Sequence, residues 1–77
     1  MNDYDFEIDQ GYHGVWRIKV LPNDTFLVYV KYPKSDIWNA PLQPSSLKNI
    51  QNAEPGEWRD KLIKMYNDHV AENILLK

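Results

Sequence analysis

The sequence predicts an α+β domain in which a three-stranded antiparallel sheet packs against one long C-terminal helix. Apolar and polar residues alternate over three stretches, about 3–9, 14–21 and 25–32, which is typical of strands. A helical spacing of apolar residues follows over about 55–75. A chain of 77 residues has room for one compact core, so we expect residues 1–77 to form a single domain.

The first predicted strand, about 3–9, carries an acidic residue at every second position. Its apolar face comprises Tyr4, Phe6 and Ile8, and its acidic face comprises Asp3, Asp5, Glu7 and Asp9. This alternation is typical of a half-buried strand. The acidic row is either a surface for a cationic partner or the solvent-facing side of an ordinary strand.

The strands at about 14–21 and 25–32 are predicted to form a hairpin. A shift of one residue would turn every apolar side chain to the opposite face, so the two apolar faces must match. The matching register places Val20 opposite Phe26, Ile18 opposite Val28 and Trp16 opposite Val30. It leaves a three-residue loop, Pro22 to Asp24, in which Asn and Asp tolerate the left-handed backbone conformation that such loops need.

The same reasoning pairs the first strand with the second. It places Ile8 opposite Trp16, Phe6 opposite Ile18 and Tyr4 opposite Val20. On the other face, Glu7 then lies opposite Arg17, and Asp5 lies opposite Lys19. Opposite charges directly across a strand pair contribute roughly 0.2–1 kcal/mol each. The acidic row is therefore interpreted as half of a set of ion pairs on a solvent-exposed sheet face.

Residues 33–54 are predicted to form an irregular connector, because prolines recur at its limits and within it, at 33, 41, 44 and 55. Its apolar residues indicate that parts of it pack on the domain; they are Ile37, Trp38, Leu42, Leu47 and Ile50. A structureless loop of this length is uncommon in a compact domain. We therefore expect a short fourth strand near 36–39 or a short helix near 45–51, capped by Ser45 or Ser46.

The C-terminal helix is predicted over about 55–75. Pro55 suits the first helical position, and acidic residues at 54, 57 and 60 suit the positive end of the helix dipole. The apolar residues form two adjacent stripes, Trp58, Leu62, Met65, His69 and Leu76 in one and Ile63, Val70 and Ile74 in the other, with Tyr66 between them. At ~100° per residue they cover about half of the circumference, which is more than a small sheet needs.

No catalytic, cofactor or metal site is predicted. The chain has no Cys, which excludes disulfides, thiolate zinc ligands and thiol nucleophiles. His13 and His69 are separated by most of the sequence and belong to no metal-binding motif. Ser45 and Ser46 lack the Gly-x-Ser-x-Gly context of a nucleophilic serine. We therefore expect a protein that is not an enzyme.

Nothing in the sequence predicts export or membrane insertion. The longest apolar run, residues 26–30, is far too short to span a bilayer. Residues 1–9 are acidic, whereas a signal peptide begins with a basic and then an apolar stretch. With the absence of Cys, these features predict a cytoplasmic protein that binds no membrane.

The surplus of large apolar side chains favours a protein–protein interaction module, such as an adaptor, regulator or inhibitor. Large apolar patches rimmed by polar groups are typical of interaction sites. The predicted contact residues are Trp38, Tyr66, Val70 and Ile74. Two alternatives use the same residues: the connector folds over them and completes the core, or the helix faces form a homodimer.

The alternative function from another class is nucleic-acid binding. Its predicted contact residues are Arg17, Lys19, Tyr29 and Lys31, which share one sheet face. The net charge of −2 disfavours a phosphate-binding role. The carboxylates of Asp5 and Glu7 would also lie beside the basic side chains of the protein and weaken their attraction for phosphate. Single-strand binders also usually offer more than one aromatic ring. The sequence therefore ranks nucleic acid below a protein partner.

Overall fold

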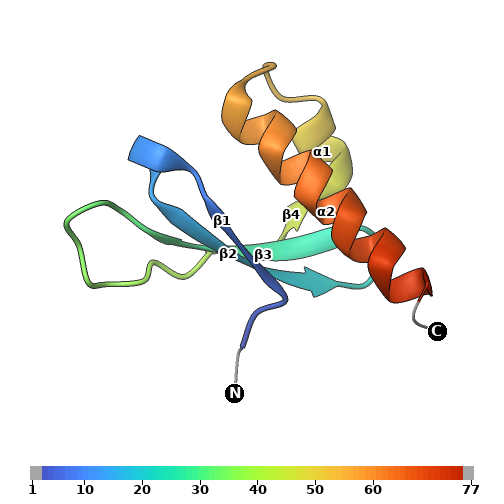
Figure 1. Ribbon diagram of the computed structural model, residues 1–77, viewed down its shortest axis with the longest axis horizontal. Coiled ribbons are helices and arrows are strands. Elements are labelled where there is room, and N and C mark those ends of the chain that lie inside the picture. Colours follow the sequence, from blue (N-terminus) through green and yellow to red (C-terminus); the bar gives the residue numbers. More distant parts are fainter. Residues whose placement is uncertain (1–2, 76–77) are drawn as a thin grey trace.

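The computed structural model describes the backbone of residues 3–75 and the side chains of residues 3–72. The elements in chain order are β1 (Phe6–Asp9), the 3-10 turn η1 (Gly11–His13), β2 (Val15–Leu21), β3 (Thr25–Lys31), β4 (Ser45–Ser46), α1 (Leu47–Gln51) and α2 (Glu57–Leu75) (Figure 1). The strands form one antiparallel sheet in the order β1-β2-β3-β4. The predicted α+β class is confirmed, with four strands rather than three.

The predicted register of the β2–β3 hairpin is confirmed. Val20 lies opposite Phe26, Ile18 opposite Val28 and Trp16 opposite Val30. Leu21 pairs with Thr25, so the loop between the strands has the three predicted residues. Asn23 and Asp24 both adopt left-handed backbone conformations, with φ of 65° and 57°. Asn and Asp are among the few residue types that tolerate this conformation, which explains their place in the loop.

Strand β1 pairs with β2 as predicted, but it begins at Phe6 rather than near residue 3. Ile8 lies opposite Trp16, Phe6 opposite Ile18 and Glu7 opposite Arg17. Asp5 interrupts the ladder, because its N–H donates to the carbonyl of Ile18, which already pairs with Phe6. Its carboxylate accepts the N–H of Val20 at 2.6 Å. The predicted pairs of Tyr4 with Val20 and Asp5 with Lys19 are therefore wrong.

The connector forms a short helix and no strand at 36–39. Within that stretch, Asn39 alone forms a bridge, with both of its backbone hydrogen bonds to Val30. Strand β4 comes later and pairs with the start of β3. Helix α1 follows at once, and its first turn is capped by Ser46, whose Oγ accepts the N–H of Asn49 at 3.1 Å. The expected helix and its serine cap are therefore confirmed.

The core lies between one face of the sheet and α2. It consists of Ile8, Ile18, Phe26, Leu62 and Tyr66, each at most 3% exposed. Further apolar side chains pack around it from both layers: Phe6, Trp16, Val20, Val28, Leu47, Ile50, Trp58, Met65 and Val70. Both helices therefore contribute to the same core, and they lie side by side in Figure 1. No helix within residues 3–75 is long and apolar enough to cross a membrane.

Tyr66 joins α2 to the hairpin loop by a polar contact as well as by packing. Its ring lies 5.2 Å from that of Phe26. Burial raises the pKa of the Tyr66 phenol, and the charge of Asp24 and a hydrogen bond with that carboxylate raise the pKa further. The hydroxyl at the edge of the core is thus satisfied by the loop between β2 and β3.

The raised pKa of Tyr66 predicts a loss of stability in alkaline solution. In the unfolded chain the phenol titrates near its ordinary pKa of about 10, below its pKa in the folded protein. The stabilisation is therefore fully present below about pH 10 and is lost as the pH rises through the folded pKa. We expect the free energy of unfolding, measured with urea, to fall less steeply above about pH 10 in Tyr66→Phe than in the wild type.

Asp24→Asn provides the second variant for this measurement. It removes the charge but keeps a residue that tolerates the left-handed conformation at position 24. Its alkaline loss of stability should be intermediate between those of the wild type and Tyr66→Phe. Parallel pH profiles for all three proteins would contradict the assignment.

Candidate functional site

The sheet face opposite the helices is called the outer face. Side chains alternate between the two faces along a strand, so the residues that alternate with the core-facing ones in β2 and β3 point to the outer face. They are Val15, Arg17, Lys19, Leu21, Thr25, Leu27, Tyr29 and Lys31. The core residues of the two helices, which include Leu47, Leu62 and Tyr66, lie against the opposite face of the sheet, so neither α1 nor α2 packs on the outer face. The outer face is therefore the broad surface available to a partner.

Arg17 is the centre of a connected group on the outer face. Its guanidinium carbon lies 4.5 Å from the ring centroid of Tyr4 and 4.1 Å from that of Trp38. Its Nε donates to Oε2 of Glu7 at 2.9 Å. The Nζ of Lys31 lies 5.6 Å from the Trp38 ring. We call these five residues the Arg17 cluster.

The rings of Tyr4 and Trp38 hold the guanidinium in a defined orientation. Cation–π contacts at exposed sites contribute about 0.5–1 kcal/mol each. The Glu7 ion pair is roughly 40% exposed, so its contribution to stability is small, about 0–1 kcal/mol. The ion pair also orients the guanidinium, because the hydrogen bond from Nε to Glu7 restricts its rotation. Among the described residues, no acceptor bonds to the terminal nitrogens Nη1 and Nη2 of Arg17.

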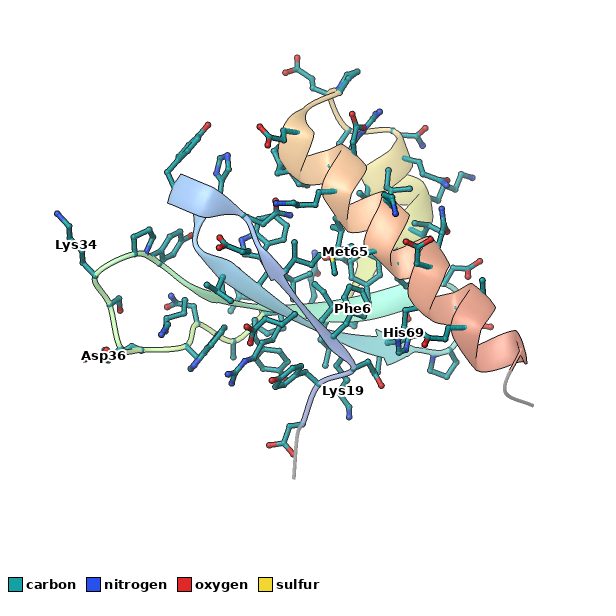
Figure 2. All side chains as sticks on the ribbon, viewed as in Figure 1. Phe6, Lys19, Lys34, Asp36, Met65 and His69 are labelled. Carbon is teal, nitrogen blue, oxygen red and sulfur yellow. The ribbon has the colours of Figure 1, made fainter. Side chains whose placement is uncertain are left out.

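The connector reaches the cluster through Trp38. The bridge between Asn39 and Val30 ties the connector to the edge of β3 immediately after Trp38. Lys34 and Asp36 lie at the tip of the connector loop, far from α2 (Figure 2). The connector also carries two exposed large apolar side chains, those of Ile37 and Leu42, and Tyr32 just before it is exposed as well. The part of the connector before β4 therefore adds exposed apolar area, whereas α1 later in the connector packs against the core.

The four residues predicted to contact a partner do not form one surface. Trp38 lies in the Arg17 cluster, but Tyr66 is 3% exposed and belongs to the core. Val70 is half-buried against the same core. The side chain of Ile74 lies outside the described residues. The prediction that Tyr66 contacts a partner is therefore corrected, because the hairpin and its loop cover this side chain.

The four residues predicted to contact nucleic acid do share the outer face. Arg17 lies directly opposite Tyr29, and Lys19 and Lys31 occupy the neighbouring positions on the same side. Sequence reasoning missed Tyr4 and Trp38 there. The displaced ladder at Asp5 sends Tyr4 to the outer face, and only the path of the connector places Trp38 on it. Neither effect leaves a periodic signal in the sequence.

A second concave region lies between η1 and the start of α2. This cleft of about 600 Å³ is lined by residues that include Gln10, Tyr12, His13, Trp58 and Lys61. Gln10 donates to the carbonyl of Trp58 at 3.1 Å, and Lys61 donates to the carbonyl of Asp9 at 2.7 Å. These two bonds join the end of β1 and the residue after it to the start of α2. Among the described residues, no three His, Cys, Asp or Glu side chains come together to hold a metal ion.

Comparisons with protein-family models, with curated proteins and with solved structures find no match to this chain.

Proposed function

We propose that this protein is a non-enzymatic protein–protein interaction module, acting in the cytoplasm as an adaptor, regulator or inhibitor of another protein. One observation carries the proposal: the rings of Tyr4 and Trp38 both contact Arg17 on a sheet face that no helix covers. Trp, Tyr and Arg are the residue types most enriched among those that dominate binding energy at protein interfaces.

The cluster is also ordered before any partner arrives. Three parts of the chain hold Arg17: the segment just before β1, strand β1 itself and, far from both in sequence, the connector. Binding to side chains that are already fixed costs less conformational entropy than binding to mobile ones. The exposed Ile37, next to Trp38 in sequence, supplies apolar surface beside this ordered centre. An ordered polar–aromatic centre with apolar surroundings suits a protein partner.

Nucleic-acid binding is the second candidate, since Tyr4, Tyr29 and Trp38 accompany the three cations of the outer face. Two features weigh against it. Tyr4 and Trp38 already stack on Arg17, so one face of each ring is occupied. The acidic residues of β1 border the same surface and oppose a phosphate backbone. A homodimer through the helix faces loses support, because Tyr66 and Val70 pack in or against the core.

The test is affinity capture from the organism's own cell extract with the wild type and Trp38→Ala. We expect one stoichiometric protein to be retained by the wild type and lost with Trp38→Ala, because removing the indole deletes the largest ring of the cluster. The captured proteins are identified by mass spectrometry, with one half of each extract treated with nuclease.

Tyr12→Ala is the matched control, because Tyr12 is an aromatic residue in η1 that is 83% exposed. It should retain the partner as the wild type does. Equal retention by Trp38→Ala would remove the Arg17 cluster from the interface. Recovery that collapses on nuclease treatment would assign the outer face to nucleic acid instead. Thermal unfolding of each variant shows whether a lost interaction reflects a lost fold.

A further inference from the structure

We infer that the Arg17 cluster binds the carboxylate of an acidic side chain presented by the partner protein. This inference rests on the proposed function and specifies its chemistry. The guanidinium of Arg17, which lies over the rings of Tyr4 and Trp38 and donates from Nε to Glu7, has its distal edge left for a ligand.

The hydrogen-bonding geometry of Arg17 supports a bidentate ligand. A guanidinium has five N–H donors, and Glu7 accepts from Nε. The pair Nη1 and Nη2 has no acceptor among the described residues and presents two parallel N–H groups. This spacing matches the two oxygens of a carboxylate. Because the guanidinium lies over the rings of Tyr4 and Trp38, the edge that carries Nη1 and Nη2 is where a ligand can bond to it.

The charges around Arg17 favour an anion at this position. Lys31 lies against the same Trp38 ring, and Lys19 is two residues along β2. Neither ammonium has a carboxylate partner among residues 3–72. In contrast, Glu7 already bonds to Arg17, and the carboxylates of Asp5 and Asp9 accept backbone N–H groups of Val20 and Gly11. These three carboxylates are thus engaged, while the two ammonium groups remain available.

The same charges favour one carboxylate over a polyphosphate chain. The cations lie on β2 and β3, and acidic residues occupy the outer side of β1. A nucleic-acid strand that crossed the face would place successive phosphates over those acids. A single acidic side chain, carried by a polypeptide whose other residues contact Trp38 and Ile37, avoids this repulsion. A partner protein is therefore the occupant that the charge distribution fits.

The experiment selects binders of the whole protein from a library of random linear peptides displayed on phage. We expect the enriched peptides to share an Asp or Glu at one position. Affinity for the best peptide should fall about tenfold or more with Arg17→Lys, which keeps the charge but loses the forked donor pair. The same loss is expected when the shared Glu of the peptide becomes Gln or its Asp becomes Asn.

Three arms complete the design. Lys34 is a cation at the tip of the connector loop, away from the Arg17 cluster, so Lys34→Gln should leave the affinity for the peptide unchanged (Figure 2). If the two groups contact each other, combining Arg17→Lys with the neutralised peptide should cost no more than either change alone. A mixed-sequence single-stranded oligonucleotide is titrated at several salt concentrations. Steeply salt-dependent binding that requires Arg17, Lys19 and Lys31 would overturn the inference in favour of phosphate.

The other outcomes separate this inference from the proposed function. Enriched peptides without a shared acidic residue, or no enrichment at all, would overturn the carboxylate assignment. The assignment also fails if the captured partner is lost with Trp38→Ala but retained at wild-type affinity by Arg17→Lys, and the interaction surface then still stands. If Trp38→Ala retains the partner, the Arg17 cluster is not the interaction surface, and if the wild type retains no protein, the proposed function fails as well.

Discussion

Replacing Gly14 with alanine is expected to destabilise this protein severely. Gly14 follows η1 with φ of +97°, a conformation that residues with a side chain rarely adopt. A Cβ at this position would meet the carbonyl oxygen and carbon of Lys31 and the Cα of Tyr32, with the last two at 3.1 Å and the oxygen closer still. All three are backbone atoms at the end of β3, so no side-chain rotation can relieve the clash.

The expected magnitude follows from two separate costs. Backbone strain of this kind costs about 1–3 kcal/mol, and overpacking against fixed atoms costs about 1–3 kcal/mol more. A domain of this size has a total stability of roughly 4–12 kcal/mol. We therefore expect Gly14→Ala to lower the midpoint of urea unfolding markedly or to prevent folding, as measured by circular dichroism.

Gly11→Ala is the matched control for this experiment. Gly11 also has a positive φ, +63°, but no atom lies within 4 Å of the position that its Cβ would occupy. Only the left-handed conformation then adds a cost, about 1 kcal/mol. Equal destabilisation by the two variants would mean that the close approach of the turn to β3 does not limit position 14.

The hairpin could be predicted because its residues repeat a pattern that only one register satisfies. Placing Phe26 and Ile18 on the same buried face fixed the pairing of β2 with β3 and the length of the loop. The pairing of Glu7 with Arg17 followed from extending the same pattern. These contacts depend on alternation, which is visible in the sequence.

The predicted pairs of Tyr4 with Val20 and Asp5 with Lys19 were wrong because a side chain takes the place of a backbone hydrogen-bond acceptor there. The carboxylate of Asp5 takes the N–H of Val20 that a continued ladder would have paired with backbone. This displacement sends Tyr4 to the outer face, although alternation assigned it to the core. Strand β4 was missed for a different reason, since two serines present no periodic pattern.

Tyr66 and Trp38 show the same difficulty for the candidate site. Tyr66 occupies the core because the carboxylate of Asp24, which is distant in sequence, accepts a hydrogen bond from its hydroxyl. Trp38 lies on the outer face because Asn39 is bound to Val30. Both placements depend on contacts between segments whose mutual position the sequence does not reveal. The composition of the site was therefore predicted in part, and its assembly was not.

Leu62→Ala is the second variant for which a large effect is expected. Leu62 is 1% exposed, and it belongs to the buried core that α2 forms with Ile8, Ile18 and Phe26 of the sheet. Truncation leaves a cavity between two layers that each supply only part of the core. Buried Leu→Ala substitutions lower the free energy of unfolding by about 2–5 kcal/mol. Because the core of this protein has few other fully buried residues, we expect a loss toward the upper end of that range. Urea unfolding measures the loss.

Leu42→Ala provides the same chemical change at a position that is fully exposed in the connector. It should change the free energy of unfolding by less than about 0.5 kcal/mol. The pair therefore separates burial from residue type within one chain. If Leu42→Ala proved as costly as Leu62→Ala, the connector would have to cover a core of its own. The exposed apolar residues of the connector would then no longer be available to a partner beside the Arg17 cluster.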